Sequence, residues 1–457
     1  MKYFSGAAAL VALSIVGSTQ AHTAFTNFFV NSVNQGDGTC VRMNNDPAKA
    51  TFPIENLASD DMACGFNGKN GVPRVCPASA GDEITFEFRD RPDTPGGGAI
   101  DPSHKGPCAV YMKKVDSAVK DTAAGDGWFK IWDDGYDQNA GKWCTEKLIA
   151  DSGHLSVNIP GDIAGGYYLI RPELLALHSA ANNPPDPQFY TGCAQIYLES
   201  KGSAIPENTV SIPGYVKISD PAMTFNIYEK PMKLPYPMYG PPAYKTSDGK
   251  SNFVSKIKQQ PQTEGFQLKN TVLESGNWDG TELSKYSDET GCWETGKQCW
   301  TQNDACWKAA PPTGGKNCKI WQQKCQDIND ACKAKNFNGP PDYMKNLTPK
   351  PSFVALPAPR QGIDGVKGSA SAKAEGPAPS SSSSAAPVSS SPKPSAFGTF
   401  SIAATPSSTP SNAPTTLATM TKNKVPMVTK YAVVTNVKVD TVTKTVVVGK
   451  HRHARHV

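Results

Sequence analysis

Histidines are the residues of this chain best suited to metal chemistry. The chain has seven, and four lie outside its C-terminal tail: His22, His104, His154 and His178. His22 follows residues 19–21, whose small-x-small pattern is typical of a signal-peptide cleavage site. Cleavage after Ala21 would give His22 a free α-amine beside its imidazole, and the two groups can chelate one metal ion. A second imidazole would complete a planar set of three nitrogens, which favours Cu(II), whereas zinc prefers tetrahedral ligands.

The first 21 residues are typical of a secretory signal. Lys2 supplies a positive charge, and residues 7–16 supply an apolar stretch that is too short to span a bilayer. No later segment reaches 18 apolar residues. We therefore expect a secreted, extracellular protein without a transmembrane segment, and its 12 cysteines to form disulfides.

Four segments follow one another along the first half of the chain. They are His22-Thr23-Ala24-Phe25, residues 103–107 (SHKGP), residues 175–180 (LALHSA), and Gln188-Phe189-Tyr190 leading to Cys193-Ala194-Gln195-Ile196-Tyr197. Together they resemble one family, the fungal cellulose-active lytic polysaccharide monooxygenases of auxiliary activity family nine. The likeness covers about residues 22–245. It implies a copper enzyme that cleaves β-1,4-glucan chains at C1, at C4 or at both, with O2 or H2O2 and an external electron donor.

The resemblance also implies a role for each residue of the site. His22 and His104 would hold one copper ion, with the Tyr197 phenol on the axis. Gln195, which points to the same face of a strand as Tyr197, would donate a hydrogen bond to the oxidant. His178 would assist oxygen binding and proton delivery. His154 has no motif around it, and we expect it at an exposed strand end.

The same resemblance suggests substrate contacts and disulfides. Residues 236–244 are similar to a C-terminal loop of the family in which an aromatic residue contacts substrate, so Tyr244 and Tyr239 would contact the sugar. Cys64 would pair with Cys193, and for the remaining cysteines of this region we expect Cys40–Cys76 and Cys108–Cys144.

These residues must be positioned by a β-rich domain. Residues 22–245 alternate short β-type runs with Gly, Pro, Asn and Asp, for example residues 83–88, 109–112, 155–159, 166–170 and 194–198. Such spacing predicts an all-β, immunoglobulin-like or fibronectin-like sandwich with long loops. The loops would carry the site.

A second unit, residues 276–343, has six regularly spaced cysteines. The gaps between Cys292, Cys299, Cys306, Cys318, Cys325 and Cys332 are seven, seven, twelve, seven and seven residues. Seven residues make about two helical turns, and residues 311–315 (PPTGG) form a central break. Of the fifteen pairings that six cysteines allow, the nested one suits two antiparallel helices. It joins Cys292–Cys332, Cys299–Cys325 and Cys306–Cys318.

Three tryptophans follow cysteines of the first helix. Trp293, Trp300 and Trp307 would form a stripe with intervals of about 10.5 Å, which is close to a disaccharide repeat. They could form a glucan-binding ledge, or they could pack the hairpin or dock on the sandwich.

Composition sets the remaining boundaries. Residues 246–275 read as a connector, 344–419 as a Ser/Pro/Ala-rich linker and 420–457 as a basic tail. The tail has eight Lys and Arg and one Asp, so the rest of the chain sums to −2 although the whole carries +5. A nucleic-acid-binding surface is not indicated. The Asn346-Leu347-Thr348 sequon predicts N-glycosylation at Asn346.

Other functions remain open on the sequence alone. A glycoside hydrolase would need a carboxylate pair, and Asp90, Asp93 and Asp101 stand in no identifiable motif. A non-catalytic copper protein that binds polysaccharide would also explain the histidines. The oxidative chemistry could act on hemicellulose instead of cellulose. The expected partners are cellulose or a related β-glucan and a small reductant or secreted redox protein, and we expect a monomer.

Overall fold

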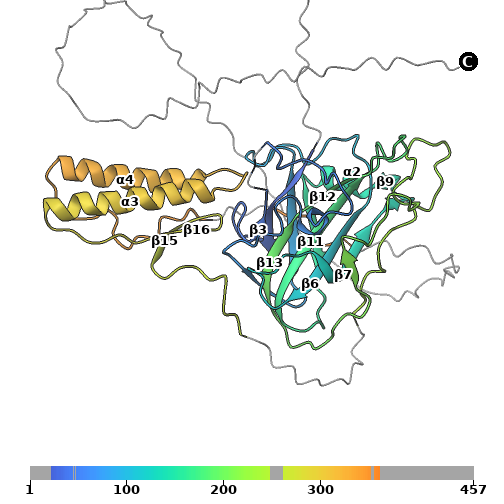
Figure 1. Ribbon diagram of the computed structural model, residues 1–457, viewed down its shortest axis with the longest axis horizontal. Coiled ribbons are helices and arrows are strands. Elements are labelled where there is room, and N and C mark those ends of the chain that lie inside the picture. Colours follow the sequence, from blue (N-terminus) through green and yellow to red (C-terminus); the bar gives the residue numbers. More distant parts are fainter. Residues whose placement is uncertain (1–21, 45, 47, 247–260, 351–354, 361–457) are drawn as a thin grey trace, which may run out of the picture. The chain divides into compact units, whose positions relative to one another are not determined.

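The β-type segments of residues 22–245 form two sheets packed face to face in the computed structural model (Figure 1). The structure describes residues 22–44, 46, 48–246, 261–350 and 355–360. The expected signal peptide and basic tail, and most of the expected linker, lie outside these residues. The predicted β-sandwich is confirmed. No helix in the described part of the chain is long and apolar enough to cross a membrane.

The smaller sheet is antiparallel, with the strand order β10-β5-β1-β2. Its strands are β1 (Ala24–Val30), β2 (Val33–Asn34), β5 (Glu83–Arg89) and β10 (His154–Asn158). Ala24 pairs with Arg89 and His154 with Glu87, so the start of β1 and the start of β10 lie at one end of the sheet. His154 is only 8% exposed and its ring lies edge-on to Phe29, so the expectation of an exposed position was wrong.

The larger sheet has the order β14-β7-β6-β11-β13-β3, with β12 on β11 and β4 parallel to β13. Its strands are β3 (Val41–Arg42), β4 (Cys76–Ser79), β6 (Cys108–Val115), β7 (Gly125–Asp134), β11 (Gly166–Ala176), β12 (Gln188–Thr191), β13 (Cys193–Glu199) and β14 (Val210–Ile212). A short ribbon and two short helices complete this domain: β8 (Tyr136–Asp137), β9 (Lys142–Trp143), α1 (Asp61–Cys64) and α2 (Cys144–Ala150).

Strand β11 changes partner along its length. Its first half pairs with β13, up to Ile170 and Ala194, and its second half pairs with β12 from Glu173 onward. Pro172 stands between these two pairings, and it has no backbone N–H to donate to either β12 or β13. Thr191 donates its hydroxyl to the Pro172 carbonyl at 2.8 Å. The end of β11 and strand β12 are thereby held together.

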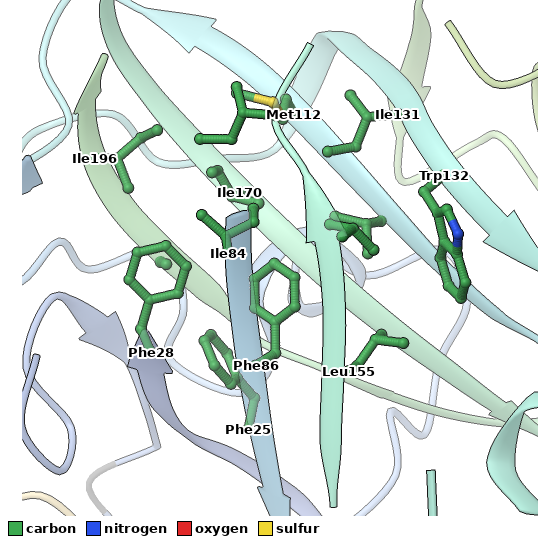
Figure 2. Close-up of a cluster of buried hydrophobic side chains, with 14 of the residues drawn as sticks. Phe25, Phe28, Ile84, Phe86, Met112, Ile131, Trp132, Leu155, Ile170 and Ile196 are labelled. Atoms are coloured by element: carbon green, nitrogen blue, oxygen red, sulfur yellow. The ribbon is translucent and has the colours of Figure 1, made fainter. Parts of the chain in front are cut away.

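Aromatic and aliphatic side chains of both sheets fill the space between them. Figure 2 shows Phe25, Phe28 and Phe86 of the smaller sheet against Ile170 and Ile196 of the larger one. Two aromatic contacts in this layer have centroid distances of 5.4 and 5.8 Å.

All three disulfides expected in the sandwich are present: Cys40–Cys76, Cys64–Cys193 and Cys108–Cys144. The Cys108–Cys144 bond joins the start of β6 to the start of α2, close to the segment that carries His104. This end of the domain is therefore covalently fixed.

The cysteine-rich unit is a helical hairpin, as predicted, formed by α3 (Glu289–Ala309) and α4 (Lys316–Lys333) (Figure 1). The nested disulfides Cys292–Cys332, Cys299–Cys325 and Cys306–Cys318 join the helices at three levels. A β-ribbon of β15 (Thr271–Ser275) and β16 (Trp278–Thr281) precedes them. Val272 and Leu273, assigned to the connector from the sequence, belong to the core of this unit with Trp321. Asn346, the predicted glycosylation site, is exposed.

The segment 355–360 returns to the sandwich, although its composition places it in the linker. The Arg360 backbone N–H donates to Ser156 on the edge strand β10 at 3.1 Å, and the Trp132 indole donates to the Arg360 carbonyl at 2.9 Å. The Arg360 guanidinium pairs with Asp151. This part of the chain is therefore attached to the domain.

Candidate metal centre

His22 lies directly before β1, at the end of the smaller sheet. Its neighbour Thr23 is buried and donates its hydroxyl to the Ala99 carbonyl at 2.5 Å. Strand pairing fixes the next residue, Ala24, opposite Arg89. The first residue of the predicted mature chain is therefore held in place by its own strand.

His104 lies in the loop between β5 and β6, and three contacts fix this loop. The His104 N–H donates to the Asp101 carbonyl at 2.9 Å, and the Leu177 N–H donates to the Lys105 carbonyl at 2.9 Å. Gly106 packs so closely against the Leu175 carbonyl that a Cβ atom would overlap it. The loop is thus attached to the end of β11, which leads directly to His178.

Four rings converge at this end of the sandwich. The ring centroids of His22 and His104 are 6.3 Å apart, and those of His104 and His178 are 4.0 Å apart. The Tyr190 ring on β12 lies 6.1 Å from His22 and 6.0 Å from His104. Segments separated by more than 160 residues in the sequence meet here.

Burial favours the neutral form of the three imidazoles. Burial lowers the pKa of His22. Burial, together with the charge of His178, lowers the pKa of His104 from 6.5 to about 4. Burial also lowers the pKa of His178, against the opposing effect of Asp186 and Asp101. Neutral imidazole is the form that binds metals.

The nitrogen atoms at this site suit a copper ion better than a metal ion that is bound by side chains alone. Within the described ranges, no group of three or more His, Cys, Asp or Glu side chains could hold a metal. A metal between His22 and His104 would therefore need a further ligand, which the α-amine released by cleavage would supply. Ser103 Oγ lies 3.1 Å from Nδ1 of His104, which leaves Nε2 for the metal. Nδ1 of His178 is buried without a hydrogen-bond partner among the described residues.

Gln195 and Tyr197 do not face this site, so their predicted roles were wrong. The Gln195 Oε1 atom accepts from Arg42 at 2.9 Å and from the Val72 N–H at 2.8 Å, and its Nε2 donates to the Val72 and Arg74 carbonyls. Tyr197 is 5% exposed, and its ring packs edge-on to Tyr167 at 5.2 Å. Both residues pair with the first half of β11, away from His178.

The residues at the site come from an equivalent pattern seven positions earlier. Gln188-Phe189-Tyr190 on β12 repeats the Gln-x-Tyr spacing of Gln195-Ile196-Tyr197 on β13. The Tyr190 hydroxyl donates to Gln188 Oε1 at 2.9 Å, and burial keeps its pKa above the usual range. β12 pairs with Glu173–Ala176, the half of β11 that leads to His178. The pairing of β12 with this half of β11 is what brings Gln188 and Tyr190, rather than Gln195 and Tyr197, close to His178.

The predicted substrate contacts also lie elsewhere. Tyr239 is 6% exposed and donates to Glu173 at 2.7 Å inside the core. Tyr244 donates to Asp162 at 2.9 Å. Asp162 follows the Asn158 end of β10, whereas His22 lies at the His154 end, so Tyr244 is bonded to the opposite end of this strand.

An aromatic residue that the sequence did not single out lies beside His22. The Phe52 ring is 42% exposed, and its centroid is 5.1 Å from that of His22. It stands in an irregular loop, where no periodic pattern marks it.

The chain is similar to a protein family and to several of its members. A family model described as "Auxiliary Activity family 9 (formerly GH61)" matches residues 22–236. An "AA9 family lytic polysaccharide monooxygenase C" of Aspergillus tamarii is 54% identical over 340 residues, which cover 73% of this chain and 91% of the relative. An "AA9 family lytic polysaccharide monooxygenase H" of Botryotinia fuckeliana is 53% identical over 345 residues, which cover 74% of this chain and 78% of the relative.

A third relative matches a shorter stretch. The "AA9 family lytic polysaccharide monooxygenase C" of Thermothelomyces thermophilus is 39% identical over 237 residues, covering 51% of this chain and 97% of the relative. The similarity to the first two relatives therefore extends beyond the sandwich domain.

Proposed function

The chain belongs to auxiliary activity family 9, the lytic polysaccharide monooxygenases, and we propose that it uses one copper ion held by His22 and His104 to cleave β-1,4-glucan chains, as in cellulose, oxidatively. The observation that carries this proposal is the convergence of the His22, His104, His178 and Tyr190 rings at one end of the sandwich. The rest of the site follows from the atoms that these residues present.

His22 and His104 would hold the ion. The α-amine and Nδ1 of His22 provide two nitrogens after cleavage behind Ala21, and Nε2 of His104 provides the third. A copper ion bound there supplies one-electron redox chemistry that lets O2 or H2O2 oxidise an otherwise inert C–H bond of the sugar. Secretion of the protein, which this mechanism requires, is supported by the sequence of residues 1–21.

Tyr190, rather than Tyr197, would be the phenol beside the bound ion, because its ring lies close to both His22 and His104. Burial raises the pKa of its phenol, which favours the neutral form. Its hydroxyl is oriented by Gln188, whose Nε2 in turn donates to Asp186 at 2.9 Å. His178, with Nδ1 free of protein partners in the described part of the chain, holds or delivers a proton at that atom.

The reaction inserts one oxygen atom into a C–H bond at C1 or C4. With H2O2 the second oxygen leaves as water, and with O2 two electrons and two protons are also consumed. The hydroxylated carbon then expels the neighbouring sugar, which breaks the chain and leaves a lactone at C1 or a ketone at C4. The electrons come from a small reductant or a secreted redox protein, and the enzyme acts as a monomer.

The test needs the mature protein with His22 as its true first residue. It is loaded with one equivalent of copper and incubated with cellulose and ascorbate, and oligosaccharides are analysed by mass spectrometry. Controls omit the reductant or use His104→Ala. We expect aldonic acids or C4-ketones in the complete reaction only.

Other outcomes separate the alternatives. Unoxidised oligosaccharides formed without reductant would indicate a hydrolase and overturn the proposal. Oxidised products from xyloglucan, glucomannan or xylan but not from cellulose would keep the chemistry and change the polymer. Tight copper binding without products on any of these polymers would favour a non-catalytic binding protein.

A further inference from the structure

One face of α3 carries three tryptophans that the histidine site does not use. Trp293 is 43% exposed and Trp307 is 39% exposed, and Trp300 between them is half-buried. We call these three residues the tryptophan ledge. They differ from Trp321 of α4, which is fully buried in the core of the hairpin and donates to the Cys299 carbonyl at 3.2 Å. Trp300 packs against this core, whereas Trp293 and Trp307 do not belong to it and remain accessible.

The ledge is held rigidly by the covalent structure behind it. The residue before each tryptophan is a buried, disulfide-bonded cysteine: Cys292, Cys299 and Cys306. Trp307 also packs against the turn between the helices, where a Cβ atom at Gly315 would lie 2.7 Å from its ring. Side chains that are ordered before binding lose little entropy when a ligand arrives.

Polar side chains occupy the gaps between the rings. Lys297 lies four residues after Trp293 and three before Trp300, and Asp304 has the same relation to Trp300 and Trp307. Residues three and four apart are neighbours on a helix, so the stripe reads Trp-Lys-Trp-Asp-Trp. Lys297 and Asp304 are both exposed. The surface therefore alternates apolar ring faces with hydrogen-bonding groups.

This alternation suits a polysaccharide more than the other common polymers. Sugar rings present C–H faces that stack on indoles, and hydroxyl edges that hydrogen-bond to charged groups. The tryptophans recur every seven residues, or about 10.5 Å along the helix, which is close to the disaccharide repeat of an extended β-1,4-linked chain. The helix has three acidic and two basic side chains, so it lacks the basic face that a nucleic acid needs.

We propose that the tryptophan ledge is a second polysaccharide-binding site, separate from the histidines, that takes a β-1,4-glucan chain lying along α3. It does not need a metal ion. Its role is to hold the enzyme on its polymer while the sandwich domain reacts, so it raises the local concentration of substrate at the histidine site.

The experiment measures binding of the full mature chain to microcrystalline cellulose, with copper removed by EDTA so that no cleavage occurs. The variants are Trp293→Ala, Trp307→Ala and the double variant. Conservative Trp→Phe changes at the same two positions should restore part of the binding. Tyr343→Ala is a matched control, because Tyr343 is an exposed aromatic of the same unit. Thermal unfolding shows whether each variant keeps its fold.

We expect the double alanine variant to bind cellulose on the order of tenfold more weakly than the wild type, because two stacking contacts are lost. The affinity of each single variant should lie between those of the wild type and the double variant. Tyr343→Ala should bind like the wild type. A folded double variant that binds as well as the wild type would overturn the proposal, as would an equal loss in Tyr343→Ala. Indole fluorescence during titration with cellohexaose gives a second readout, which must change for the wild type and not for the double variant.

The result is independent of the copper chemistry. His104→Ala should lose copper binding and retain the ledge's contribution to cellulose binding, whereas the double tryptophan variant should retain copper affinity. If His104→Ala alone abolished binding to cellulose, the ledge would not be a site.

Discussion

Two tyrosines of this chain stand in the same Gln-x-Tyr context, and they provide a matched pair of variants. The Tyr190 ring lies about 6 Å from both His22 and His104, whereas Tyr197 packs on Tyr167. We expect Tyr190→Phe to change the electron paramagnetic resonance spectrum of bound Cu(II) and to lower the rate of oxidised-product formation at least tenfold. Tyr197→Phe should leave the spectrum unchanged. A changed spectrum in Tyr197→Phe alone would restore the assignment made from the sequence.

A pH effect on the metal-free protein follows from His104. Its pKa falls from 6.5 in the unfolded chain to about 4 in the fold, so the folded state binds the proton less readily. The stabilisation that neutral His104 contributes should be fully present above pH 6.5. The free energy of unfolding should therefore decrease as the pH drops from 6.5 to about 4. The loss is at most about 3 kcal/mol.

The measurement is urea unfolding of EDTA-treated protein at several pH values, with His104→Gln as the reference. The wild type should lose more stability than the variant over this interval. Parallel curves for the two proteins would show that His104 does not carry the effect.

The sequence identified the three histidines of the site because each stands in a distinctive motif. It failed for the glutamine and tyrosine, because Gln188-Phe189-Tyr190 and Gln195-Ile196-Tyr197 have the same local pattern. Only the partner change of β11 at Pro172 decides which pattern lies near His178. Phe52 could not be found, since an irregular loop is placed by tertiary contacts.

At the scale of elements, Gln195 has a structural role that can be separated from catalysis. Its amide bonds to Arg42 and to the backbone of Val72 and Arg74, and so joins β13 to β3 and to the loop before β4. Gln195→Ala would leave these buried groups unpaired. We expect a loss of about 1–3 kcal/mol in the free energy of unfolding, with copper affinity unchanged.

Gln188→Ala is the matched variant for this comparison. Gln188 is half-buried and bonds to Tyr190 and Asp186, so its loss should affect the copper spectrum more than stability. Chemical unfolding and copper titration of both variants test the distinction. A stable Gln195→Ala protein with weakened copper binding would contradict it.

Prediction of the elements succeeded where the sequence has a strict period. The seven-residue cysteine spacing indicated the helical hairpin and its nested disulfides, all of which are present. The β15–β16 ribbon was missed because its strands are only five and four residues long. They are stabilised by tertiary contact instead, such as the Trp278 ring against Trp321 at 5.5 Å.

At the scale of the whole molecule, composition assigned residues 355–360 to a linker, whereas the structure attaches them to the sandwich. Residues 355–360 contain two prolines and read as linker, yet Arg360 bonds through its backbone to both sheets of the sandwich. The composition of a segment indicates whether the segment has enough apolar residues to bury a core of its own. It does not report hydrogen bonds that a short segment offers to an existing domain, and these are what hold this segment.

A pair of truncations tests that attachment. A chain ending at Arg360 keeps the carbonyl that accepts from the Trp132 indole, whereas a chain ending at Lys350 removes it. Trp132 is buried between the sheets, so an unpaired indole N–H there should cost about 1–3 kcal/mol. We expect thermal unfolding of the sandwich at a lower temperature for the chain ending at Lys350, and no difference between the full chain and the chain ending at Arg360. Since both truncated chains retain the helical hairpin, equal unfolding temperatures for the two would mean that residues 355–360 do not stabilise the sandwich.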